Sequence, residues 1–327
     1  MVNIKKSLTI KLILIVLLGI TSINQYSIIF VHAQSNYHLA LEMGTQILEV
    51  KRYDDQTWKN TVNINSSPID WFGGESNKVG AKGKNTLFEL GYGGCGTEWI
   101  FTNFVIPQNT MDIYNFLWEF GYNQTFLYDN YPRSYILWGY NYNYWQFTIK
   151  EFHDIPDDSN EHSIILQYPQ NFSTALNDYN NFSGIINNDT TLQSLGYSFP
   201  ILSGDDLLWQ YFTRRFAVAS PINEYLTTLT NTLECENTTN RGNTLTFQRS
   251  GLKNYIVEVT YSTKGIIDHV IVKNSEGYIF YEITSFYPKI IFYIIVGILA
   301  IFILGIVTLV IVKKIKLQKQ FKNDMNR

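Results

Sequence analysis

The chain has 327 residues, with 25 Lys and Arg against 28 Asp and Glu, and a formal net charge of −3. Without its two basic ends, the part from 34 to 289 carries 16 basic and 27 acidic side chains, a charge of about −11. A surface of this sign repels phosphate backbones, which excludes nucleic acid as an expected partner.

The N-terminal end has the pattern of an export signal. Three lysines precede an apolar run at residues 12–20, and Val31-His32-Ala33 offers a small-residue cleavage site. Residues 1–33 are therefore predicted to be a signal peptide. The polar patch TSINQYS makes the region before the cleavage site unusually long, so an uncleaved signal anchor stays open as an alternative.

The first exported segments read as strands that are interrupted by glycines. Residues 37–43 and 45–55 flank Gly44 and predict two short strands or one strand with a bulge. The stretch GYGGCG (91–96) matches a dinucleotide loop in spelling alone, because the following EWIFTNFVIP is typical of a strand and offers no helix N-terminus. We expect a tight turn around Cys95 and no phosphate site.

Aromatic residues are concentrated in PRSYILWGYNYNYWQF, residues 132–147. Alternating tyrosines on a strand share one face, and flat amphipathic rings suit sugars, peptides or apolar ligands. An alternative stays open, in which these rings are ordinary strand residues packed under helices. The candidate ligand-binding aromatics are Tyr135, Trp138, Tyr140, Tyr142, Tyr144 and Trp145.

The segments 144–152 and 162–168 predict a hairpin across an acidic loop. Oxygen donors at short spacing on a loop suit Ca²⁺, but the glycine and the order of a calcium loop are absent, so a solvated loop is the competing interpretation and no cofactor is expected. The candidate metal-binding residues are Glu151, Asp154, Asp157 and Asp158.

Helical spacing appears in three segments, 111–121, 205–217 and 222–233, and the second of these has Asp205 or Asp206 as its expected cap. The polar stretch 171–190 is expected to be a surface excursion. From residue 255 to 284, three alternating apolar segments separated by turns predict an antiparallel meander.

The clearest signal is at the C-terminal end. Residues 290–312 contain no charge and no proline, and a helix of this length spans roughly 34 Å, enough for a hydrocarbon core of about 30 Å. Residues 313–327 carry six Lys and Arg with one acid, which predicts a cytoplasmic tail. The chain is thus expected in the cell membrane as a single-pass type I protein, with residues 34–289 outside.

An oxidising exterior favours pairing of the two cysteines, so a Cys95–Cys235 disulfide is predicted, with two buried thiols as the alternative. The exported part also contains sequons, which are acceptors for N-glycans where the host glycosylates. They begin at Asn65, Asn123, Asn171, Asn181, Asn188 and Asn237.

Catalytic signatures such as G-x-S-x-G and H-E-x-x-H are absent from the sequence, which favours a protein that is not an enzyme. Carboxylate pairs of glycosidases leave no such motif, so a membrane-anchored hydrolase of envelope sugars or peptides stays open.

Two segments, TQILEVKRYDDQTWKN and VEVTYSTKGIIDHVIVKNSEGYIFYEI, resemble uncharacterised single-pass membrane proteins of Asgard archaea. The resemblance implies topology, and no activity or site residues come with it. The meander is also similar to the curved sheet of lipoprotein-carrier domains, as a fold analogy alone.

Taken together, these patterns predict an α+β, β-rich ectodomain with mostly antiparallel sheet, a few helices on one side and one C-terminal transmembrane helix. The expected function is extracellular recognition of a protein, glycan or apolar ligand. A hydrolase and a structural surface protein are the alternatives.

Overall fold

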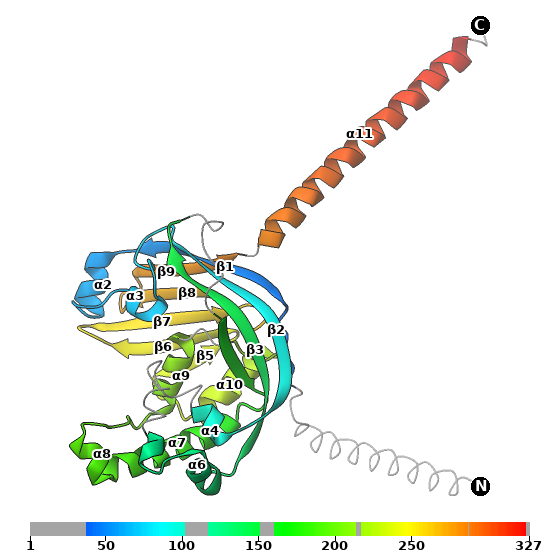
Figure 1. Cartoon of the computed structure of the whole chain (residues 1–327). Coiled ribbons are helices and arrows are strands. Elements are labelled where there is room, and N and C mark those ends of the chain that lie inside the picture. The colour runs from blue at the N-terminus through cyan, green and yellow to red at the C-terminus, as the bar shows by residue number, and fades with distance from the viewer. Residues whose placement is uncertain (1–36, 102–116, 151–159, 214–216, 287, 325–327) are drawn as a thin grey trace, which may run out of the picture. The chain divides into compact units, whose positions relative to one another are not determined.

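The computed structural model describes residues 37–101, 117–150, 160–213, 217–286 and 288–324. Its centre is one antiparallel sheet in the order β4-β3-β2-β1-β9-β8-β7-β6-β5, curled into a half-barrel (Figure 1). The α+β expectation is therefore confirmed. The strands are β1 (Gly44–Tyr53), β2 (Lys82–Gly96), β3 (Ser134–Thr148), β4 (Asn160–Leu166), β5 (Thr238–Arg241), β6 (Thr244–Ser250), β7 (Asn254–Tyr261), β8 (Ile267–Asn274) and β9 (Ile279–Phe286).

Helices α9 and α10 lie within the curve of the sheet, with α7 beside them (Figure 1). Two short helices, α2 and α3, connect β1 to β2, and the others fill the long connections from β2 to β3 and from β4 to β5. The bounds are α2 (Asp55–Thr61), α3 (Ile69–Phe72), α4 (Thr97–Ile100), α6 (Gln124–Asn130), α7 (Asn171–Asn188), α8 (Thr190–Ser194), α9 (Gly204–Thr213) and α10 (Ile222–Thr232).

The core between the helices and the concave face is largely aromatic. Trp209 and Phe212 of α9 lie with ring centroids 5.4 and 5.7 Å from Phe247 of β6. Phe72 of α3 stacks on Tyr281 of β9 at 5.7 Å. Rings of this size bury much apolar area, and their edge-to-face and stacked contacts add to the stabilisation that comes from burial.

The predicted meander is confirmed as β7, β8 and β9, which pair in sequence order. In β7 the buried and half-buried side chains alternate without a break, as expected for a strand with one face in the core. β3 also pairs with β4, as the predicted hairpin requires, but the expected register is wrong, because residues 137–143 pair with 160–166 and residues 144–148 extend beyond β4. Residues 151–152 of the predicted hairpin lie outside the described residues. The first predicted strand differs, since β1 starts at Gly44 and residues 39–43 form no strand.

The prediction of a tight turn at 91–96 is wrong. The glycines lie inside β2, where Gly91 pairs with Gly139 and Gly96 with Ser134. The hydrogen bonds between paired strands use only backbone groups, so a glycine-rich segment can still form a strand. The strand predicted just after the glycines is also wrong at its start, because Thr97–Ile100 form the short helix α4, and 102–110 lie outside the described residues.

The stretch 171–190 was expected to be a polar surface excursion, and this is wrong as well. It forms α7, whose buried residues include Phe172, Tyr179, Phe182 and Ile186. Their spacing of three to seven residues places them on one helix face. Intervening Asn, Ser and Asp residues hide this pattern in the sequence.

The helices expected at 205–217 and 222–233 correspond to α9 and α10. α9 ends at Thr213, residues 214–216 lie outside the described residues, and Ala217 is not helical. Ser203 precedes α9 and accepts a hydrogen bond on Oγ from the Asp206 backbone N–H at 3.1 Å, so Ser203 is the cap instead of the aspartates. Of the helix expected at 111–121, residues 117–119 are helical, and 111–116 lie outside the described residues.

One long helix, α11 (Pro288–Asp324), follows β9 after a single residue. Its part Ile295–Lys314 is long and apolar enough to cross a membrane, and none of that part is buried. This candidate span overlaps the predicted segment 290–312. The helix continues through the basic residues to Asp324 without a break.

Candidate ligand pocket

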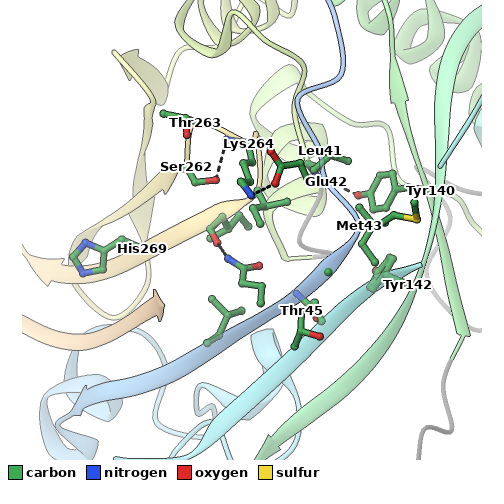
Figure 2. Close-up of a pocket in the computed structure, with 18 of the residues that line it drawn as sticks. Leu41, Glu42, Met43, Thr45, Tyr140, Tyr142, Ser262, Thr263, Lys264 and His269 are labelled. Atoms are coloured by element: carbon green, nitrogen blue, oxygen red, sulfur yellow. Dashed lines mark hydrogen bonds and ion pairs between the residues drawn. The ribbon is translucent and has the colours of Figure 1, made fainter. Parts of the chain in front are cut away.

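A cavity of about 440 Å³ opens on the concave side of the sheet, close to the first residues of β1 and β8 (Figure 2). Its size falls within the range of about 300–1,000 Å³ that is typical of small-molecule sites. The lining residues are Leu41, Glu42, Met43, Gly44, Thr45, Gln46, Leu48, Phe72, Asn85, Leu87, Tyr140, Tyr142, Ala217, Ser262, Thr263, Lys264, Ile266, Ile267, His269, Val270 and Ile283.

The wall is mainly apolar because of strand alternation. Leu48 of β1, Val270 of β8 and Ile283 of β9 are at most 5% exposed and belong to the face that carries the core. Val270 and Ile283 are direct partners in the β8–β9 register, so their side chains lie side by side. An apolar wall of this kind favours an apolar part of a ligand.

Two of the predicted aromatics, Tyr140 and Tyr142 of β3, line the pocket. Their rings stack at 5.6 Å, and Met43 lies beside them in Figure 2. The Tyr140 hydroxyl accepts a hydrogen bond from the Ala217 backbone N–H at 3.2 Å. Burial raises the pKa of Tyr140, so this hydroxyl stays protonated at neutral pH.

Two amide side chains bring polar atoms into the wall. The Gln46 side chain is buried and donates from Nε2 to the Ile267 carbonyl at 2.6 Å. Asn85 Oδ1 is buried and has no hydrogen-bond partner among the described residues. A buried acceptor that stays unpaired costs about 1–3 kcal/mol.

The rim is polar and consists of two segments, 41–44 and 262–266. Lys264 Nζ donates to Glu42, which joins the two segments across the mouth (Figure 2). The loop 262–266 is tight, because the Ser262 N–H donates to the Ile266 carbonyl at 2.8 Å and Gly265 adopts φ +79°. Met43 at the same rim is 65% exposed, an apolar side chain facing solvent at the entrance.

Gly265 holds this loop against the segment beyond α9. The Val218 N–H donates to the Gly265 carbonyl at 2.8 Å, and a Cβ on Gly265 would lie 2.0 Å from the Val218 carbonyl oxygen. Both the left-handed φ and the close approach require glycine. The loop and Ala217, next to Val218, therefore form one side of the mouth.

The other predicted aromatics do not line the cavity. Tyr144 donates its hydroxyl to the Phe72 carbonyl at 2.9 Å. Trp138 lies 6.2 Å from the ring of Tyr92, Trp145 lies under Lys84 Nζ at 6.0 Å, and Tyr135 is buried. These four residues therefore fit the alternative interpretation of the sequence, in which the aromatic rings are ordinary packing residues.

The predicted disulfide is not present. Cys95 is in β2 opposite Tyr135, whereas Cys235 follows α10, and the two sulfurs are not at bonding distance. The sequence argument used only the compartment and the even count, and neither contains distance information.

The candidate metal residues Glu151, Asp154, Asp157 and Asp158 lie outside the described residues. Among 37–101, 117–150, 160–213, 217–286 and 288–324, no group of three potential ligands is close enough to hold a metal ion. Four of the sequon asparagines are exposed, namely Asn65, Asn181, Asn188 and Asn237, while Asn123 and Asn171 are half-buried.

Sequence reasoning missed most of the pocket. Residues of the rim, such as Met43 and Lys264, follow no motif, and they meet only because β1 and β8 begin at the same edge of the sheet. The one local signal was the break at Gly44, which separates the rim segment from β1.

The catalytic groups available in the pocket are few. Among the residues that line it, the one carboxylate is Glu42, which is paired with Lys264. His269 pairs through Nε2 with Glu282 Oε1 at 3.0 Å, and its ring points away from the labelled tyrosines in Figure 2. The arrangement suits binding better than acid–base chemistry.

Comparison of the chain with protein-family models, curated proteins and solved structures gives no significant match.

Proposed function

We propose that the chain is a membrane-anchored extracellular binding protein of single-pass type I topology, and that the pocket holds an apolar or amphiphilic ligand. The observation that carries the proposal is the 440 Å³ cavity with an apolar wall and a polar rim. At roughly 30 Å³ for a water-sized group, this volume holds on the order of 15 such groups, enough for one hydrocarbon chain.

The polar atoms of the pocket support an amphiphile over a plain hydrocarbon. Ser262, Thr263 and Lys264 gather at the rim, so the polar end of a ligand would face the mouth and its apolar part the wall. The candidate span in α11 supports the anchor, and the basic residues after it support the orientation.

Photoaffinity labelling tests this function. The full chain in nanodiscs is incubated with a long-chain fatty acid that carries a mid-chain diazirine, and cross-linked peptides are identified by mass spectrometry. We expect label on β1, β3 and β8. Label confined to α11 would contradict the proposal, since that is the pattern of simple partition into lipid.

A matched pair of variants sharpens the result. Leu87→Trp fills the cavity and should reduce pocket labelling at least tenfold. Phe88→Trp changes the next residue, which is 42% exposed and does not line the cavity, and should leave labelling unchanged. Equal labelling of both variants would show that the fatty acid lies elsewhere.

A further inference from the structure

The rim of the pocket lies at the same edge of the sheet from which the chain continues into α11. β9 ends at Phe286 opposite Ile47 of β1, and the two strands are antiparallel. Going backwards along β1, from Ile47 to Gly44, therefore follows the same direction in which β9 leaves the sheet. At about 3.4 Å per residue, Gly44 lies roughly 10 Å beyond the level of Phe286.

The second rim segment occupies the same edge. β8 is antiparallel to β9 and pairs His269 with Thr284, so its first residue, Ile267, lies near the level where β9 ends. The loop 262–266 comes directly before Ile267 and thus also projects beyond the sheet on this side. Both sides of the mouth share the edge that β9 leaves.

The connection to the apolar helix is short. Only Tyr287 separates Phe286 from Pro288, and two extended residues span at most about 7 Å. Two further helical residues, at about 1.5 Å each, reach Ile290, where the uncharged stretch begins. The last residue of β9 therefore lies within about 10 Å of the first residue of the apolar stretch.

These distances of about 10 Å are close to the thickness of the polar layer of a bilayer, which is about 5–8 Å on each side. From this we infer that the mouth opens onto the headgroup layer, and that the ligand is a membrane amphiphile which enters the pocket directly from the leaflet. The inference rests on the proposed function and names the source and class of its ligand. The exposed Met43 and the ionic Lys264–Glu42 pair at the rim match the mixed chemistry of that layer.

Tryptophan quenching measures where the mouth lies. Met43→Trp places a probe at the rim, and Leu252→Trp places one in the β6–β7 turn at the opposite edge; the two native side chains are 65% and 60% exposed. The full-length variants are placed in nanodiscs of phospholipid brominated near the headgroup. The native tryptophans contribute the same fluorescence to both variants. After this contribution is subtracted, we expect the fluorescence of Met43→Trp to be quenched at least twofold more than that of Leu252→Trp. Equal quenching would overturn the inference.

A spacer variant tests the route of the ligand. Inserting about 20 Gly and Ser residues after Phe286 adds a flexible link of roughly 25 Å. Pocket labelling by a diazirine phospholipid resident in the bilayer should fall at least fivefold, while labelling by the fatty acid delivered from cyclodextrin in the aqueous phase should persist. Undiminished labelling from the bilayer would overturn the inference and leave the proposed function standing. Absence of pocket labelling from both sources, already in the unmodified chain, would overturn the proposed function itself.

Discussion

At the scale of single residues, Cys235 combines burial with a nearby negative charge. Its thiol is half-buried close to Asp205, whose carboxylate accepts hydrogen bonds from the Glu236 and Asn237 N–H groups at 3.0 and 3.1 Å. Burial first and the Asp205 charge second raise the pKa of Cys235 to about 12. The thiolate, which is the reactive form, is therefore scarce at neutral pH.

This predicts slow alkylation of Cys235. A shift from 9.0 to about 12 lowers the thiolate fraction at pH 8 by roughly 1,000-fold, and the rate of reaction with iodoacetamide should fall strongly relative to the same protein in urea. Because the pKa is raised, the rate in the folded protein should keep increasing well above pH 9. The measurement is mass spectrometry of a Cys95→Ser variant over a pH series.

The unmodified chain provides the control for the disulfide. After unfolding without reductant, both cysteines should react. If neither reacts until reductant is added, the bond predicted from the sequence forms after all.

At the scale of elements, the two turns of the meander offer a comparison of glycines. Gly265 in the β7–β8 turn and Gly277 in the β8–β9 turn both have left-handed backbones, at φ +79° and +85°. A Cβ on Gly277 meets nothing within 4 Å, whereas one on Gly265 meets the Val218 carbonyl. The two positions therefore separate backbone strain from a steric clash.

Gly277→Ala should cost about 1 kcal/mol of unfolding free energy, from strain alone. Gly265→Ala should cost at least about 2 kcal/mol more, because the loop must move away from Val218, and it should also weaken pocket labelling. Thermal unfolding of both full-length variants in nanodiscs checks this. Equal melting temperatures would mean that the contact with Val218 contributes little.

The same elements show how far sequence patterns reach. β7 to β9 were predictable, because the alternation of buried and half-buried positions is local and their turns are short. α7 was hidden because its apolar face is separated by Asn, Ser and Asp, which raise the polarity of the whole stretch. The glycine strand was hidden because its order comes from pairing with β3 and not from its own side chains.

The pocket was only partly predictable for a related reason. The alternation of Tyr140 and Tyr142 placed both on one face, and this face is the one that lines the cavity. The β2 bulge between Leu87 and Glu89 and the approach of 262–266 to 41–44 depend on the tertiary fold. No local pattern contains them.

At the scale of the whole molecule, the proposed orientation predicts which asparagines receive glycans. Translated with microsomes, the chain should be glycosylated at exposed sequons such as Asn237, which precedes β5. The glycans should slow the chain on a gel, and deglycosylation should abolish this shift. Asn237→Gln should reduce the shift by the amount that one glycan causes. Asn123 should stay unmodified, because it is half-buried and its Oδ1 caps α6 by accepting the Phe126 N–H at 3.0 Å. A chain without any glycan in this assay would contradict the orientation.

The strand order also has a consequence for synthesis. β1, the first of the described strands to be made, lies inside the sheet and pairs with β9, the last of the described strands. The cavity takes its wall from both, so it cannot be complete while the ribosome is still making the final strand. An unfinished polypeptide thus lacks the proposed binding site, and the cavity is completed only when the apolar helix that is proposed to enter the lipid follows β9.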